Sequence, residues 1–254
     1  MYHQSYVHKM LTGRMAAFLD PAKYNDVTGY TNPDESEHDF FTIGHTSTSV
    51  SLAMGLAKGR DLTGGKENII AVIGDGSLSG GEALEGLNNA AMLGSNMIII
   101  VNDNDQSIAE NHGGLYKGLK ELRDTNGESP DNIFKAMGLE YYYLGDGHDV
   151  SALIKLFTSV KDIDRAVVLH IHTIKGKGLK YAEENKNNKT LINELIEKAR
   201  NYKGLSHREA AVLLECDLEE ENNKIYSLAK EIKEKFYGNR IVMFAPLYLS
   251  LIHI

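Results

Sequence analysis

One segment sets the architecture of this chain: Ile69-Ile70-Ala71-Val72-Ile73-Gly74-Asp75-Gly76. Its five consecutive apolar residues are typical of a parallel strand that is covered on both faces. The two glycines indicate a tight turn at the end of that strand. Residues 80–93 then carry apolar side chains at helical spacing, and a second apolar run occupies residues 97–101. The segment and its neighbours therefore predict a strand–helix–strand unit over residues 69–101.

The same alternation continues beyond this unit. Further strands are predicted at 141–144 and 166–171, and further helices at 49–58, 132–137 and 150–160. Strands that alternate with helices form a parallel sheet with helices on both faces, so the predicted fold class is α/β.

The character of the sequence changes near residue 180. Residues 183–189 are polar and turn-prone, and the chain from there to about residue 237 has helical spacing. Ser206 and Glu209 have the spacing of a capping box within it. We predict an α/β domain over residues 1–186 and a helical appendage over residues 187–254.

Composition excludes several classes of protein. The 254 residues carry a net charge of −8, and a pI near 5.7 is a poor basis for binding duplex DNA. The single cysteine, Cys216, excludes an internal disulfide framework and a zinc or iron–sulfur site held by cysteines of this chain alone. No apolar run approaches the roughly 20 residues of a membrane span, and residues 1–9 lack the apolar core of a signal peptide. The sequence predicts a cytoplasmic protein with no nucleic-acid or membrane partner.

Oxygen-bearing side chains follow two neighbouring strands of the predicted sheet. Asp75 stands in the turn after the first strand, and Asn104 follows the second strand 29 residues later. The carboxyl ends of parallel strands meet at one edge of a sheet, where a helix N-terminus can also receive a phosphate. An Asp repels a bare phosphate but suits a phosphate that carries Mg²⁺, which prefers carboxylate and carbonyl oxygens. The spacing therefore predicts a site for magnesium and a phosphate group.

A second Gly-Asp-Gly turn serves as a control within the same chain. Gly145-Asp146-Gly147 also follows a predicted strand, but the residue 29 positions beyond Asp146 is Lys175, which offers no oxygen ligand. A lone Gly-Asp-Gly is most often only a turn. The first copy is favoured because strand, turn, helix, strand and Asn104 all follow in register.

The pair Gly74-Asp75-Gly76 and Asn102-Asp103-Asn104 resembles the thiamine diphosphate fingerprint, and the surrounding sequence resembles the 1-deoxy-D-xylulose-5-phosphate synthase family. The resemblance covers about residues 2–186, and its motifs lie at 3–14, 35–39, 44–49, 74–89, 102–108, 146–149 and 175–178. It implies the diphosphate-binding α/β domain of a transketolase-like enzyme, with thiamine diphosphate and Mg²⁺ as cofactors.

The resemblance also implies a role for each matching residue. Mg²⁺ would be ligated by Asp75, the side-chain oxygen of Asn104 and the main-chain carbonyl of Gln106. The cofactor would be contacted by His3, Gly44, His45, Thr46, Gly76, Ser77 and Asn104. His3 and His45 are the implied catalytic residues, because an imidazole that titrates near neutrality can carry protons beside the reacting carbon.

The implied reaction joins pyruvate to glyceraldehyde 3-phosphate with loss of carbon dioxide, for isoprenoid, thiamine and pyridoxal synthesis, in a homodimer by analogy with the family. The chain departs from the family pattern in three ways. A leading segment with a Gly-Gly-His motif is missing before His3, no domain follows that would carry the cofactor-activating glutamate, and Leu179 stands where the family has Tyr. We therefore expect an N-terminally truncated part of the enzyme that is inactive alone. The alternatives are a non-catalytic cofactor-binding or dimerisation fragment, and one subunit of a split transketolase-like enzyme.

The tail carries a different likeness. Residues 204–210 and 235–250 resemble the N-terminal lead of the radical-SAM tyrosine lyase that matures FeFe-hydrogenase. The three-cysteine motif of that family is absent, so we expect no cluster and no lyase activity. We hypothesise that two unrelated segments meet near residues 186–190, through a gene fusion or a misjoined reading frame.

Overall fold

The computed structural model describes residues 4–107 and 110–240. The chain divides into two compact units, Met1–Lys175 (unit 1) and Gly176–Ile254 (unit 2). This division precedes the predicted boundary at 186/187, because helix α9 (Lys180–Asn185) packs against helix α11 (His207–Leu214) of unit 2.

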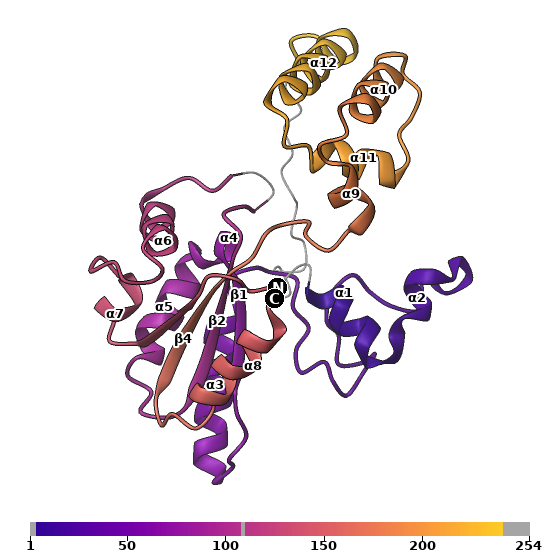
Figure 1. The fold of residues 1–254 in the computed structure, drawn as a ribbon. Coiled ribbons are helices and arrows are strands. Elements are labelled where there is room, and N and C mark those ends of the chain that lie inside the picture. Colours follow the sequence, from indigo (N-terminus) through magenta and orange to yellow (C-terminus); the bar gives the residue numbers. More distant parts are fainter. Residues whose placement is uncertain (1–3, 108–109, 241–254) are drawn as a thin grey trace. The chain divides into compact units, whose positions relative to one another are not determined.

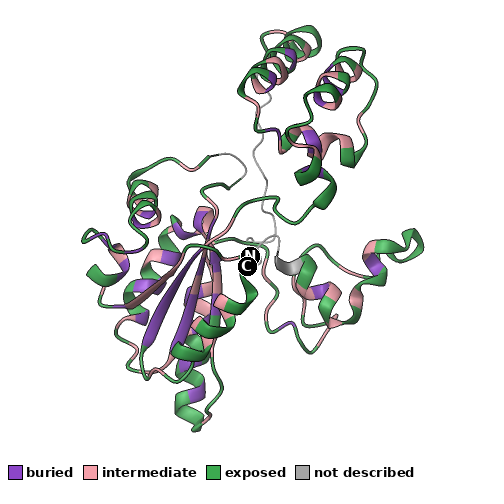
Figure 2. Ribbon diagram, in the orientation of Figure 1, coloured by how far each residue is buried: buried purple, intermediate pink, exposed green. Residues whose placement is uncertain are grey.

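Unit 1 is built on a four-stranded parallel sheet in the order β1-β2-β4-β3 (Figure 1). The strands are β1 (Ile70–Gly74), β2 (Met97–Asp103), β3 (Glu140–Leu144) and β4 (Ala166–His172). The predicted parallel α/β fold is thereby confirmed. Figure 2 shows the middle of the sheet as buried, which explains the unbroken apolar runs.

Of the helical segments in the described part of unit 1, five precede β1 and the others lie between successive strands. They are α1 (Gln4–Lys9), the π-helical turn η1 (Met10–Arg14), α2 (Ala16–Leu19), the 3₁₀ turn η2 (Pro21–Lys23), α3 (Ser49–Thr63), α4 (Asp75–Leu78), α5 (Gly81–Ala90), α6 (Gly114–Asp124), α7 (Ile133–Ala136) and α8 (Val150–Val160). The prediction of one helix over 80–93 missed the separate turn of α4, which precedes α5 and contains Asp75.

Apolar side chains cover both faces of the sheet. On one face a core cluster joins α3, α5, α6 and α7 to the strands, and it includes the fully buried Ile99 of β2. On the other face Val160 and the neighbouring side chains of α8 pack against Ile98 and Leu169. Successive residues of a strand point to opposite faces, so Ile98 and Ile99 face different sides of the sheet. Both residues are apolar because helices cover both sides.

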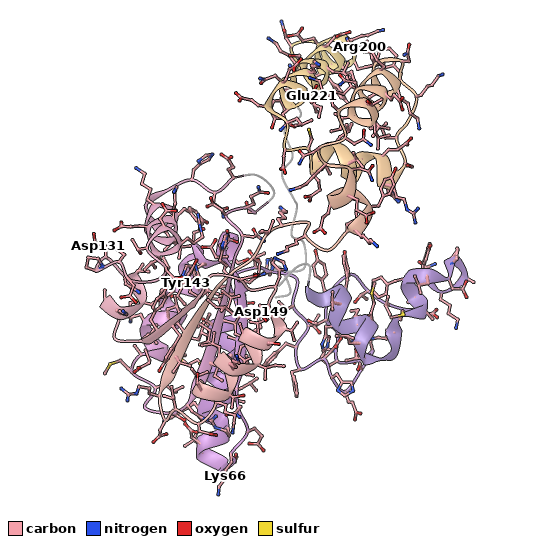
Figure 3. The ribbon with its side chains drawn as sticks, viewed as in Figure 1. Lys66, Asp131, Tyr143, Asp149, Arg200 and Glu221 are labelled. Atoms are coloured by element: carbon pink, nitrogen blue, oxygen red, sulfur yellow. The ribbon has the colours of Figure 1, made fainter. Side chains whose placement is uncertain are left out.

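Unit 2 consists of α9, α10 (Lys189–Arg200), α11 and α12 (Glu219–Tyr237). Its core contains Ile192, Leu195, Ile196, Val212, Leu228 and the buried thiol of Cys216. Glu221 of α12, labelled in Figure 3, is nearly inaccessible and pairs with Lys189 and Lys224, each at 3.3 Å. The prediction of a polar turn over 183–189 is wrong for residues 183–185, which belong to α9, and for Lys189, which begins α10.

Across the described ranges 4–107 and 110–240, no helix has the length and apolar character needed to cross a membrane.

The predicted capping box is present at the start of α11. Ser206 Oγ accepts a hydrogen bond from the Glu209 amide at 3.3 Å, and Glu209 Oε2 accepts one from the Ser206 amide at 2.7 Å. We expect Ser206→Ala to lower the stability of unit 2 by about 1 kcal/mol, because the first turn of α11 loses its cap. Hydrogen–deuterium exchange of the α11 amides measures this. Ser227→Ala, which removes only a hydroxyl bonded to the Asn223 carbonyl within α12, should leave that exchange unchanged; equal effects of the two substitutions would contradict the capping role.

Candidate functional site

The turn after β1 presents a buried carboxylate at the carboxyl end of the sheet. Gly74 is extended (φ −79°, ψ 153°), and Asp75 begins the single turn of α4. Asp75 is 2% exposed, and its Oδ2 accepts a hydrogen bond from Asn111 Nδ2 at 2.7 Å. Burial, together with the negative charge of Asp103, raises the pKa of Asp75 to about 6. A divalent cation would stabilise this carboxylate in its ionised form.

The loop after β2 lies against this turn. Gly74 is paired with Asn102 in the sheet, so Asp75 and the residues after Asn102 reach the same edge. A Cβ atom on Gly76 would lie 2.6 Å from Ser107 Cβ and 3.3 Å from Ser107 Cα, which shows how closely the loop approaches. The structure therefore brings together the two segments that contain the predicted metal ligands.

The predicted ligands Asn104 and Gln106 lie within this loop. Asn104 is half-buried, and its Oδ1 accepts a hydrogen bond from the Gln106 amide at 3.2 Å. Asp105, between them, has a left-handed backbone (φ 61°), and its amide donates to Asp103 Oδ1 at 3.0 Å. One carboxylate with amide and main-chain carbonyl oxygens is a donor set that suits Mg²⁺.

Among the residues that the structure describes, no group of three or more His, Cys, Asp or Glu side chains is placed to hold a metal ion. The proposed ligand set contains only one such side chain, Asp75, and so has a different composition. Its metal role stays a prediction.

The motif at residues 44–49 is bonded to the same turn. Ser47, with a positive φ of 72°, donates from Oγ to the Ser77 carbonyl at 2.7 Å. A Cβ atom on Gly80 would collide with the Ser47 side chain, so the two segments touch directly. Gly44, His45 and Thr46 precede this contact and are exposed. His3 lies outside the described residues.

Besides Asn111, the side chains of Tyr116 and Lys175 lie near the turn and were not predicted from the sequence. Tyr116 of α6 donates to Ser79 Oγ at 2.8 Å, and Lys175 Nζ, just after β4, donates to the Ser107 carbonyl. Tyr116 lies on the same helix as the apolar series Leu115, Leu119 and Leu122. The helical spacing of these leucines could have indicated α6, which was not predicted from the sequence. These contacts close the turn and the loop against α6 and β4.

Asp103, the residue before Asn104, belongs to a buried polar network. Asp103 Oδ2 accepts a hydrogen bond from Arg123 Nη1 at 2.6 Å and lies 2.8 Å from His170 Nε2. Tyr141 Oη lies 2.8 Å from His170 Nδ1. Tyr143, labelled in Figure 3, packs its ring edge-on against His170, with ring centroids 5.1 Å apart.

The network keeps the Asp103 carboxylate charged. Burial opposes the ionisation of Asp103, but the hydrogen bonds from His170 and Arg123 outweigh it and hold its pKa at about 2. Burial also raises the pKa of Tyr141 well above its ordinary value. Asp103 and Asp75 therefore have pKa values shifted in opposite directions at one edge of the sheet.

The second Gly-Asp-Gly turn has a different environment. Asp146 is exposed, and its Oδ1 accepts a hydrogen bond from the His148 amide at 3.0 Å. The amide of Gly147 donates to the His172 carbonyl at 2.8 Å. Exposure and a local turn distinguish Asp146 from the buried Asp75.

Gly76→Ala tests the contact between the turn and the loop. The new methyl group would overlap Ser107 Cβ, which is tied to the backbone, so the loop must move away from Asp75. We expect thiamine diphosphate with Mg²⁺ to bind about tenfold more weakly, as for changes in residues that orient metal ligands. Isothermal titration calorimetry measures the affinity. Gly81→Ala, where the added Cβ meets no atom within 4 Å, is the matched control and should bind like the wild type; equal affinities for Gly76→Ala and the wild type would contradict the prediction.

The family model and the sequence relatives that match this chain carry the same family name. The family model for 1-deoxy-D-xylulose-5-phosphate synthase matches residues 1–129 and 124–173. Proteins of that name from Clostridium beijerinckii and Parabacteroides distasonis are each 39% identical to this chain, and 1-deoxy-D-xylulose-5-phosphate synthase 1 from Geobacter metallireducens is 40% identical. Each alignment covers 72% of this chain and 35% of the relative.

The chain thus spans about a third of the length of the curated relatives it matches. A solved structure described as that of a thiamin diphosphate-dependent enzyme from Mycobacterium smegmatis aligns with a TM-score of 0.41 at 20% identity, over 55% of this chain and 24% of that one. A structural likeness this slight adds nothing to the assignment. The match of the family model and the sequence relatives establish that the chain belongs to the 1-deoxy-D-xylulose-5-phosphate synthase family.

Proposed function

We propose that unit 1 is the part of a 1-deoxy-D-xylulose-5-phosphate synthase that binds the diphosphate of thiamine diphosphate together with Mg²⁺. The observation that carries the proposal is the pairing of Gly74 with Asn102, because it brings the Asp75 turn and the Asn104 loop to one edge of the sheet. Family membership supports the identity of the cofactor.

The residues of this chain would bind and orient the cofactor. Asp75, the side-chain oxygen of Asn104 and the main-chain carbonyl of Gln106 would ligate Mg²⁺, whose charge offsets that of the diphosphate. Gly76 and Ser77 would face the diphosphate from the start of α4, where backbone N–H groups lack helical partners. When bound, thiamine diphosphate supplies a carbon nucleophile for a 2-oxo acid and carries the resulting negative charge.

Proton transfer beside the reacting carbon would fall to His45 and His3. His45 lies in the exposed segment just before Ser47, which is hydrogen-bonded to the turn of α4. An imidazole can both accept and donate a proton near neutral pH. In the complete reaction pyruvate loses carbon dioxide and its remaining two-carbon unit joins glyceraldehyde 3-phosphate. We place this chemistry in a cytoplasmic homodimer that serves isoprenoid, thiamine and pyridoxal synthesis, by analogy with the family.

One experiment separates this proposal from its alternatives. The purified chain is titrated with thiamine diphosphate in the presence and absence of MgCl₂, and is then assayed with pyruvate and glyceraldehyde 3-phosphate, alone and with a candidate partner subunit. We expect Mg²⁺-dependent binding without turnover by the chain alone. Rescue by the partner would identify a subunit of a split enzyme, whereas binding that no partner converts into turnover would identify a non-catalytic cofactor-binding fragment. A chain that does not bind the cofactor would overturn the proposal.

A further inference from the structure

A single guanidinium group holds the residues on both sides of Asn104. Arg123 Nη1 donates to Asp103 Oδ2 at 2.6 Å, and Arg123 Nη2 lies 2.8 Å from Asp105 Oδ1. Arg123 comes from the last turn of α6, and its side chain is only 9% exposed. The planar fork of arginine can reach two separate carboxylates with fixed geometry, which the single ammonium group of lysine cannot do.

The other strands and the loop itself complete this arrangement. Asp103, which is fully buried, lies 2.8 Å from His170 of β4 through its Oδ2 atom. Beyond Asp103, Thr173 donates from Oγ1 to Asn102 Oδ1 at 2.7 Å, and the Thr173 amide donates to the Asp103 carbonyl at 2.8 Å. The loop is thus attached at residues 102, 103 and 105, and Asn104 lies between the attached positions.

The left-handed backbone of Asp105 needs such support. Its φ of 61° is unfavourable for a residue with a Cβ atom, although Asp and Asn tolerate it better than most. The ion pair with Arg123 and the hydrogen bond from the Asp105 amide to Asp103 both favour this conformation. A left-handed residue turns the chain sharply, so it sets the direction of the backbone between Asn104 and Gln106.

Stability alone is a weak reason for this network. Burying Asp103 and Arg123 removes both charges from water, and a buried ion pair is often no more stabilising than apolar side chains of similar volume. The pair with Asp105 adds little, because Asp105 is 54% exposed and exposed ion pairs are weak. The Arg123 guanidinium, by pairing with both Asp103 and Asp105, instead fixes the conformation of the loop after β2.

We propose that Arg123 is a positioning residue, which sets the loop over residues 103–107 so that Asn104 and Gln106 can bind Mg²⁺. The inference rests on the proposed function, because it takes the loop to be part of the metal site. Asp105 has a positioning role as well, because its ion pair with Arg123 fixes the backbone on the far side of Asn104.

Asp105→Asn gives the sharpest test. Asn tolerates the left-handed backbone as Asp does, but it removes the ion pair with Arg123. The affinity for thiamine diphosphate is measured by calorimetry at several MgCl₂ concentrations, and the unfolding midpoint is measured without ligand. We expect binding about 10- to 100-fold weaker, as for other residues that orient metal ligands, with an unchanged midpoint and recovery at high MgCl₂.

Arg123→Lys should weaken binding similarly, because lysine can pair with Asp103 but not with both carboxylates. Asp124→Asn, which breaks the exposed pair with Lys120 on the same helix, is the matched control.

A second readout works without any ligand. If Arg123 orders the loop, hydrogen–deuterium exchange at residues 104–107 should be faster in Asp105→Asn than in the wild type and unchanged in Asp124→Asn. Absence of Mg²⁺-dependent binding by the wild-type chain would overturn the proposed function, and unchanged exchange would still overturn the role of Arg123. If the wild type and Asp105→Asn both bind thiamine diphosphate with the same Mg²⁺-dependent affinity, the positioning role of Arg123 is wrong but the proposed function stands.

Discussion

Asp75→Asn is expected to abolish Mg²⁺-dependent binding of thiamine diphosphate and, at the same time, to stabilise the ligand-free protein. The substitution removes the only carboxylate of the proposed metal site. Removing a residue that merely orients a metal ligand typically costs 10- to 100-fold in affinity, so loss of the ligand itself should cost at least about 100-fold. Calorimetric titration with thiamine diphosphate and MgCl₂ measures the affinity.

The gain in stability follows from the raised pKa of Asp75. A carboxyl whose pKa is about 6 when folded and near 3.8 when unfolded disfavours folding at neutral pH by on the order of 2–3 kcal/mol. Asn has nearly the shape of the protonated acid, and its amide oxygen can still accept the hydrogen bond from Asn111. The variant should therefore unfold at higher urea concentration than the wild type when no metal is present.

This gain must depend on pH with a definite sign. Well above pH 6 the wild-type carboxylate is ionised in both states, so the advantage of Asn is complete. As the pH falls from about 6 to about 4, the folded wild type takes up a proton before the unfolded chain does, and the advantage disappears. Urea titrations at pH 8 and pH 4 test this sign.

Asp146→Asn provides the matched control. It makes the same change in the second Gly-Asp-Gly turn, where the carboxylate is exposed. It should alter neither the affinity for the cofactor nor the unfolding free energy. Full Mg²⁺-dependent binding by Asp75→Asn would remove Asp75 from the site, and a gain in stability that is equal at both pH values would contradict the link to its ionisation.

The sheet could be predicted from the sequence because its signal is local. Parallel strands that are buried on both faces are expected to be apolar throughout. Residues 97–101 satisfy this requirement, and residues 166–171 satisfy it except at His170. The edge that carries Asp75 and Asn104 was equally predictable, since parallel strands align their carboxyl ends. The capping box at Ser206 depends on residues three positions apart and is also local.

Other parts of the fold depend on contacts between distant residues and were missed. The helix α1 ends at Lys9, a fully buried lysine that donates to Glu35, and no apolar pattern reveals it. The helix α9 is mostly polar, with Ala182 as its one buried residue, and it packs against α11. At the site, the ion pairs of Arg123 with Asp103 and Asp105 connect α6 to the end of β2, about twenty residues away in the sequence. Such pairings depend on the folded arrangement and not on spacing.

The motifs at residues 3–14 and 35–39 illustrate the same limit. Their family likeness was evident, but their structural role is an ion network in which Arg14 forms two hydrogen bonds with Asp39, at 2.7 and 2.8 Å. His8 Nε2 lies 2.8 Å from Asp39, and the Asn32 amide donates to it at 2.8 Å. The Asp39 side chain is fully buried. A sequence motif can thus mark a fold-stabilising network as readily as a site.

Asp39→Ala should consequently open the segment over residues 8–39. The substitution leaves the guanidinium of Arg14 largely buried without its bidentate partner, and breaking a buried pair in this way costs about 3–5 kcal/mol. Arg14 keeps its contact with Glu35 at 3.2 Å, which favours the lower end of that range. We expect the amides of this segment to exchange with solvent at least about 100-fold faster, since about 1.4 kcal/mol corresponds to a factor of ten.

Amides of the sheet serve as an internal reference for this experiment, and Asp34→Ala is the matched control because Asp34 is exposed. Unchanged exchange at residues 8–39 in Asp39→Ala would show that the network contributes no stability. Faster exchange throughout unit 1 would show instead that the segment and the sheet unfold together.

The pH dependence of this segment should be opposite in sign to that of Asp75. The hydrogen bonds from Arg14, opposed by burial, hold the pKa of Asp39 far below its usual range, and those from Lys9 and Thr28 outweigh burial and lower the pKa of Glu35 to about 2. The stability that they contribute is complete above about pH 4.5 and is lost as the pH falls toward 2 and below. Protonation of Asp75, by contrast, stabilises the fold between pH 6 and 4. Ligand-free wild type should therefore gain stability from pH 7 to about pH 4 and lose it below, whereas Asp75→Asn should show only the loss. Urea titrations of the wild type and of Asp75→Asn from pH 7 to pH 2 test this, because the substitution removes the gain between pH 6 and 4 and leaves the loss at lower pH.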